Sequence, residues 1–143
     1  MRIAKRDDWK TEAMPSASTN ITVEKLYSQE EFDRITAGVI PEQMEDKWFI
    51  FYEAPWVYLH RSWTGFCIFK VRFEVVGESV KIAEVQVNRD PAQYSSMDDE
   101  RDASMLRILL DSRAKRDVRN PVLRYIKGQS EEFIVAPSIT RNV

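Results

Sequence analysis

Residues 66–89 read FCIFKVRFEVVGESVKIAEVQVNR, and this stretch decides the fold that the sequence predicts. Apolar and polar residues alternate on both sides of the turn signal Gly77-Glu78-Ser79, a pattern typical of a β-hairpin with one buried face. A three-residue loop places Arg72 opposite Glu84, whereas a two-residue loop would place Val71 opposite that carboxylate. Because opposite charges stabilise cross-strand pairs, we expect the three-residue loop.

Two more strands are expected upstream of this hairpin, separated by the turn signals Ala54-Pro55 and Thr64-Gly65. Connections this short can join only antiparallel neighbours, because a parallel crossover needs a dozen residues or more. The expected strands are residues 47–53, 56–63, 66–76 and 80–89. Together they predict a four-stranded antiparallel β-meander.

Two helices flank the meander in the sequence. The capping-box pattern Ser28-Gln-Glu-Glu31 predicts a short N-terminal helix over residues 29–37, which Gly38 can terminate. The acidic run Asp98-Asp99-Glu100 opens a second helix that extends to about Ala114 and carries a broad apolar arc. The predicted fold class is therefore α+β, with the meander packed against the C-terminal helix.

The length of 143 residues predicts one domain. Residues 1–20 are polar and are expected to form an N-terminal arm, residues 21–128 a single α+β domain, and residues 129–143 a C-terminal tail. The tail contains the apolar run Phe133-Ile-Val-Ala136, which suits an edge strand or a docking segment.

Cysteine and motif content restrict the function classes. The single cysteine, Cys67, cannot form an intrachain disulfide and favours a reducing compartment. The first residues lack a signal-peptide apolar run and no stretch approaches 18 apolar residues, so we expect a cytoplasmic protein without membrane contact. One histidine and one cysteine cannot build a Cys/His zinc site, and we expect neither metal nor cofactor. No nucleotide-loop, hydrolase-elbow or zinc-peptidase motif occurs, which favours a non-enzymatic protein.

The strand parity, carried through two-residue loops, predicts two sheet faces. The expected core face holds Phe49, Phe51, Tyr58, His60, Cys67, Phe69, Val71, Phe73, Ala83, Val85 and Val87. The expected opposite face holds Trp48, Ile50, Tyr52, Val57, Leu59, Arg61, Trp63, Ile68, Lys70, Arg72, Glu84 and Gln86.

Eight residues of the opposite face form the predicted site, because Trp and Arg are enriched in binding surfaces. They are Trp48, Tyr52, Arg61, Trp63, Lys70, Arg72, Glu84 and Gln86. The leading interpretation is a binding or interaction module that holds a protein partner or a second copy of itself, as in a homodimer. The alternative without a binding function is a solvent-exposed sheet face with cross-strand ion pairs.

A second functional interpretation is a site for a small anionic ligand of the nucleotide or ADP-ribose type, with or without hydrolysis. Arg61, Arg72 and Glu84 would supply its polar groups, and the indole of Trp63 would stack on the ligand.

His60 and Cys67 are each unique in the chain, and the predicted register places them diagonally on adjacent strands. A Cys/His nucleophilic dyad needs such proximity. The aromatic and aliphatic surroundings favour two core residues instead, since a free cysteine is among the most buried residue types.

The basic segment 113–127 offers a weaker nucleic-acid hypothesis. It holds six Lys or Arg side chains broken by one acid, Asp117, and a basic run can contact phosphates. The chain carries a net charge of −2, however, and a basic helix end facing solvent explains the segment equally well. Nucleic-acid binding is therefore the least favoured interpretation.

Three consecutive segments resemble the signature of a family of small uncharacterised bacterial proteins. They are Pro41–Glu53 (PEQMEDKWFIFYE), Trp56–Gly65 (WVYLHRSWTG) and Phe66–Glu74 (FCIFKVRFE), which cover about a quarter of the chain. The stretch HRSWTG is the most distinctive part. The resemblance implies a self-standing domain and brings no activity with it.

Overall fold

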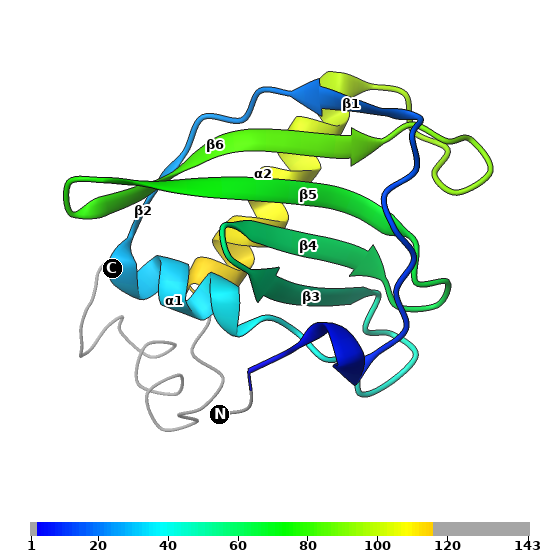
Figure 1. The fold of residues 1–143 in the computed structure, drawn as a ribbon, viewed down its shortest axis with the longest axis horizontal. Coiled ribbons are helices and arrows are strands. Elements are labelled where there is room, and N and C mark those ends of the chain that lie inside the picture. The colour runs from blue at the N-terminus through cyan, green and yellow to red at the C-terminus, as the bar shows by residue number, and fades with distance from the viewer. Residues whose placement is uncertain (1–2, 116–143) are drawn as a thin grey trace, which may run out of the picture.

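The computed structural model describes residues 3–115. Within them six strands form one antiparallel sheet in the order β1-β6-β5-β4-β3, and β2 also pairs with β6 (Figure 1). The strands are Ser18–Ile21 (β1), Leu26–Ser28 (β2), Trp48–Glu53 (β3), Trp56–Arg61 (β4), Cys67–Val76 (β5) and Ser79–Asn88 (β6). The helices are the 3-10 turn Arg6–Asp8 (η1), Gln29–Ala37 (α1) and Asp99–Lys115 (α2). The α+β class and the meander, β3 to β6, are confirmed.

Two strands were not predicted, and both lie on the outer edge of β6. Strand β1 falls mostly inside the predicted arm, where Ser18 pairs with Asn88 and Ile21 with Val85. The arm is also attached to the first helix, because the Ala4 amide donates to the Ala37 carbonyl at 2.9 Å. The arm therefore belongs to the folded unit and packs on the chain's own sheet.

The β5–β6 hairpin confirms the pairing of Arg72 with Glu84 but not the loop length. Val76 pairs with Ser79, so the turn has two residues. The register shifts between the Arg72 and Phe73 pairs, which leaves Ala83 as an extra residue in β6. Such a β-bulge moves one strand by one residue, and it restores the charge pairing that the two-residue turn alone would have lost.

A second bulge, between β4 and β5, overturns the predicted faces. Leu59 pairs with Phe69 and His60 pairs with Cys67, so Ile68 is the extra residue. One inserted residue moves every side chain beyond the bulge to the other face of the sheet than the regular register predicts. The observed core face holds Trp48, Ile50, Tyr52, Val57, Leu59, Phe69, Val71, Phe73, Ile82, Val85 and Val87. The observed opposite face holds Phe49, Phe51, Trp56, Tyr58, His60, Cys67, Lys70, Arg72, Glu84 and Gln86.

Both helices cover the core face. In Figure 1 α2 runs behind the sheet, and its buried residues Leu106, Leu110 and Ala114 join the main hydrophobic core, as predicted for this helix. Helix α1 adds Ile35 to the same core. It begins with the predicted capping box, in which the Ser28 hydroxyl accepts from the Glu31 amide at 3.1 Å.

The opposite face has two parts. Over β3 the N-terminal segment packs on it, and Ala4, Phe49 and Phe51 form a small second core there. Over β4, β5 and β6 neither α1 nor α2 lies on it (Figure 1), and the N-terminal segment reaches it only at Tyr58, where the Arg6 guanidinium of η1 lies 4.9 Å from the ring centre. We call this second part the open face and define it by Trp56, Tyr58, Lys70, Arg72, Glu84 and Gln86.

Candidate functional site

The structure separates the eight predicted site residues into two groups of four. Lys70, Arg72, Glu84 and Gln86 lie together on the open face. Trp48, Tyr52, Arg61 and Trp63 lie on the core-face side or in the turn after β4. The prediction that all eight share one face is wrong, because the bulge at Ile68 stands between the two groups.

Trp48 and Tyr52 mainly border the core. The Trp48 ring lies 6.2 Å from that of Phe69, and the Tyr52 ring meets Phe32 edge-on at 5.5 Å. Both tryptophan and tyrosine therefore contribute to packing between the sheet and its surroundings. Trp48 also carries the Arg61 guanidinium 4.6 Å above its ring, which fixes the direction of that arginine.

On the open face, aromatic rings and charged groups alternate. The Lys70 ammonium lies 4.7 Å from the Trp56 ring centre and 5.5 Å from that of Tyr58. Next to it, Arg72 Nε contacts Glu84 Oε1 at 3.2 Å. Trp56 and Tyr58 were missed as site residues, because the sequence-based register assigned Tyr58 to the core face and placed Trp56 on neither face. Their alternation in WVYLH is the signal that could have found them.

A second site lies at the turn that joins β4 to β5. A pocket of about 240 Å³ opens there, which we call the turn pocket. It is lined by Lys47, Arg61, Trp63, Thr64 and Gln93. Two of these, Arg61 and Trp63, were predicted site residues, and Lys47, Thr64 and Gln93 were not. Gln93 lies about 30 residues after Trp63 in the sequence, and no local sequence pattern connects it to the turn.

The turn is anchored from several directions. The His60 ring donates from Nδ1 to the Gly65 carbonyl at 2.8 Å, and the Ser62 hydroxyl donates to the Asp46 carbonyl at 2.7 Å. From the N-terminal segment, Trp9 Nε1 donates to the Ser62 carbonyl at 2.7 Å. Hydrogen bonds within the chain therefore hold the turn that carries Trp63 in one arrangement.

His60 and Cys67 are cross-strand partners, and the pKa of each is shifted in the direction that favours its neutral form. Burial lowers the pKa of His60, although its hydrogen bond to the Gly65 carbonyl acts in the opposite sense. Burial raises the pKa of the Cys67 thiol to about 12. A thiolate–imidazolium dyad needs the reverse of both shifts. These shifts favour the interpretation of the two residues as part of the core.

We predict that the Cys67 thiol is protected in the folded protein. It is 1% exposed, and at pH 8 a thiol with a pKa of about 12 is almost wholly protonated. Iodoacetamide should label the native chain at least 100-fold more slowly than the chain in guanidinium chloride, a conservative bound. Mass spectrometry of quenched samples measures both rates. Equal rates in the two states would contradict the burial of this residue.

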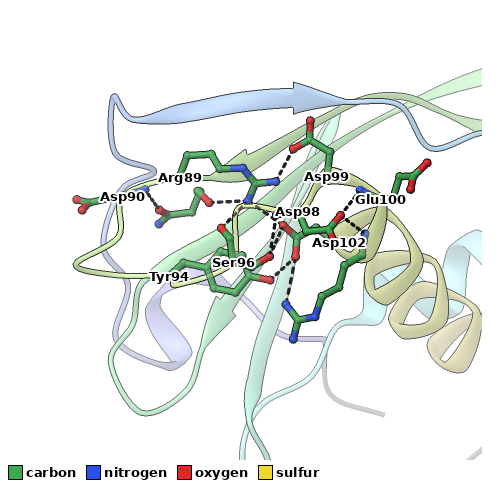
Figure 2. A network of polar contacts seen from close by, with 10 residues as sticks. Arg89, Asp90, Tyr94, Ser96, Asp98, Asp99, Glu100 and Asp102 are labelled. Atoms are coloured by element: carbon green, nitrogen blue, oxygen red, sulfur yellow. Dashed lines mark hydrogen bonds and ion pairs between the residues drawn. The ribbon is translucent and has the colours of Figure 1, made fainter.

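A buried polar network joins the end of β6 to the start of α2 (Figure 2). The Asp102 carboxylate accepts from the Tyr94 hydroxyl at 2.6 Å and the Ser96 hydroxyl at 3.0 Å, and pairs with Arg89 Nη1 at 2.8 Å. Burial and the bond to Asp102 raise the pKa of Tyr94 to about 12. Each of these groups already has partners within the network, so we assign it a structural role.

Other features carry no site. Of the basic segment 113–127, residues 116–127 lie outside the described part of the chain, as does the tail. Among residues 3–115 no group of His, Cys, Asp and Glu side chains could hold a metal ion. No helix in this range has the length and apolar character needed to cross a bilayer.

Comparisons with known proteins return nothing: no protein-family model, curated protein or solved structure matches the chain.

Proposed function

We propose that this chain is an interaction module whose open face pairs with the open face of a second copy, giving a homodimer. The observation that carries the proposal is a stretch of β4, β5 and β6 that neither α1 nor α2 covers and that carries half-buried aromatic side chains. Trp56 and Tyr58 supply the apolar part. Tryptophan and tyrosine are enriched among the residues that contribute most to protein interfaces.

The charges on this face favour a protein surface over a polyanion. The face itself holds Lys70 and Arg72 on β5 and Glu84 on β6. The ion pair Glu74–Lys81 lies beside it on the same two strands, so both signs occur on both strands. A twofold axis through such a face can place cations of one copy against carboxylates of the other. Nucleic acid would instead select a field of one sign.

Lys70 is the charged residue of the open face that has no ion-pair partner within residues 3–115. Within residues 3–115 it contacts two aromatic rings, and no carboxylate lies at ion-pairing distance from it. Arg72 and Lys81 already pair with Glu84 and Glu74. An opposing carboxylate, or the carbonyl groups of a partner, would satisfy the Lys70 ammonium when the face is covered.

Replacing Trp56 with alanine should weaken the dimer at least tenfold, since truncating a central aromatic anchor of an interface typically costs about 2 kcal/mol or more. Sedimentation equilibrium over a concentration series measures the dissociation constant. Trp63→Ala is the matched control, because Trp63 follows the far end of β4 and is outside the open face. Circular dichroism of each variant establishes that it is folded.

A wild-type chain that remains monomeric at the highest concentration tested would overturn the proposal. So would a dimer that Trp63→Ala weakens and Trp56→Ala leaves intact, since the interface would then lie at the turn.

A further inference from the structure

We infer that the turn pocket is a binding site for a small anion attached to a flat ring, the chemical class of a mononucleotide. This inference does not depend on the open face or on dimerisation. It rests on the charge of the lining residues, on the hydrogen-bonding groups they leave unused, and on the position of Trp63.

The charged residues that line the pocket are both cations. Lys47 and Arg61 contribute to its wall, and neither has a carboxylate at ion-pairing distance within the described chain. The adjacent acid, Asp46, accepts from the Glu42 amide at 3.0 Å and does not line the pocket. Two cations without counter-charges at one small cavity favour an anionic ligand.

The two neutral polar residues of the lining, Gln93 and Thr64, also have hydrogen-bond donors without a partner in the described chain. Asn88 Nδ2 donates both to the Cys67 carbonyl and to Gln93 Oε1, each at 2.9 Å. The Gln93 oxygen is thus engaged, and its NH₂ group remains for a ligand. Thr64 Oγ1 accepts from the Phe66 amide at 3.2 Å, so its hydroxyl hydrogen is free to donate. A pocket that offers mainly donors fits a ligand group made of acceptors, such as phosphate or carboxylate.

Trp63 supplies a flat wall. Its side chain is 61% exposed, yet its indole N–H donates to the Met44 carbonyl at 3.0 Å, which restrains the ring. An exposed but restrained indole can stack on a planar group at little cost in conformational entropy. The anchored turn beneath it, with Ser62 bound to Asp46 and to Trp9, keeps the indole and the cations in one arrangement.

The size of the pocket restricts the ligand. Its volume of about 240 Å³ is below the range of about 300–1,000 Å³ typical of drug-sized ligands. One phosphate with one ring stacked at the mouth fits this volume, whereas a dinucleotide would extend beyond it. The mononucleotide class therefore combines the anion, the planar group and the size.

Isothermal titration calorimetry of the full chain with AMP and GMP tests the inference. Both should bind with a dissociation constant of about 1 mM or lower. Adenosine and inorganic phosphate should each bind at least tenfold more weakly than AMP, because each keeps only one of the two recognised parts. Raising the salt concentration should weaken AMP binding, since the cations are near the surface.

Variants separate the pocket from the rest of the chain. Trp63→Ala should raise the dissociation constant for AMP about tenfold, and Trp63→Phe, which keeps a ring, should recover part of the affinity. Lys47→Ala should weaken AMP but leave the weak binding of adenosine unchanged. Trp56→Ala, on the open face, is the matched tryptophan control and should bind AMP like the wild type.

Three results would overturn the inference. The first is the absence of saturable binding of either nucleotide by the folded chain. The second is equal affinity for AMP and adenosine, which would remove the role of the cations. The third is an unchanged affinity in Trp63→Ala, which would place any nucleotide site elsewhere. Because dimerisation is measured separately in the Trp56→Ala variant, failure at the open face does not affect these outcomes.

Discussion

Replacement of Asp102 with alanine is expected to lower the free energy of unfolding by about 3–5 kcal/mol, the range for breaking a buried ion pair from one side. The Asp102 side chain is fully buried and pairs with Arg89 Nη1 at 2.8 Å. The Arg89 side chain is only 11% exposed, so removing the buried carboxylate leaves a largely desolvated cation that keeps only the exposed Asp99 as an ion-pair partner within residues 3–115. The Tyr94 hydroxyl would also lose its acceptor at 2.6 Å.

The same arginine provides the control. Asp99 contacts Arg89 Nη2 at 2.6 Å, but its side chain is 62% exposed, and Asp99→Ala should cost no more than about 1 kcal/mol. Urea unfolding followed by circular dichroism gives both values. A similar loss in the two variants would show that burial does not determine the strength of this network. Loss in neither variant would show that the connection between β6 and α2 does not limit stability.

The sequence predicted the strands of the meander and the two α-helices that flank it because their signals are local. Alternation over five or more residues indicates a strand, and the Ser28–Glu31 capping box marks a helix start within a residue or two. The pairing of Arg72 with Glu84 was predictable for a similar reason, since both residues are close to one turn and carry opposite charges. Each of these inferences needed only residues that are near in the chain.

The bulges could not be predicted in the same way. Ile68 lies in the apolar run FCIF, where either register buries an apolar side chain. The extra residue therefore does not change the alternation of apolar and polar residues. Ala83 is small enough to be accommodated on either face. Because a single inserted residue exchanges the faces of all that follows, a missed bulge changes the composition of a predicted site more than a misplaced strand end does.

Strand β1 was missed because its partner is distant in the chain. Ser18 pairs with Asn88, and the sequence STNI contains one clearly apolar residue, Ile21, so alternation is too short to detect. An edge strand of this kind acquires its conformation from the neighbour that it pairs with rather than from its own residues.

The structure divides the residues of the predicted site into two groups, and sequence proximity or direct strand pairing explains which of them stay together. Arg61 and Trp63 stay together because only Ser62 separates them in the chain, and Lys70 stays with Gln86 because the hairpin pairs them directly. The prediction that the two groups share one sheet face was wrong, because the bulge at Ile68 lies between them. Gln93 enters the turn pocket from the β6–α2 connection, and only tertiary structure brings it there.

Replacement of Gly38 with alanine is expected to cost about 3 kcal/mol or more, the second largest loss that the structure predicts. Gly38 caps α1 with φ +77° and ψ −169°, a region that L-residues rarely adopt. A Cβ atom there would clash with the Ile50 carbonyl oxygen and would lie 2.9 Å from the Ala4 side chain. The Ile50 carbonyl also accepts from the Val39 amide at 2.9 Å, so the backbone cannot retreat without losing that bond.

Gly77→Ala separates steric clash from backbone strain. Gly77 also has a positive φ, +62°, but a Cβ atom there would meet nothing within 4 Å, so only the strain of about 1–2 kcal/mol should appear. Urea unfolding of both variants tests the difference. Because Gly38 lies between α1, β3 and the arm at Ala4, its substitution should also speed amide hydrogen exchange at Ala4, and Gly77→Ala should not. Equal losses in the two variants would mean that the contact between the helix end, β3 and the arm is loose enough to admit a methyl group.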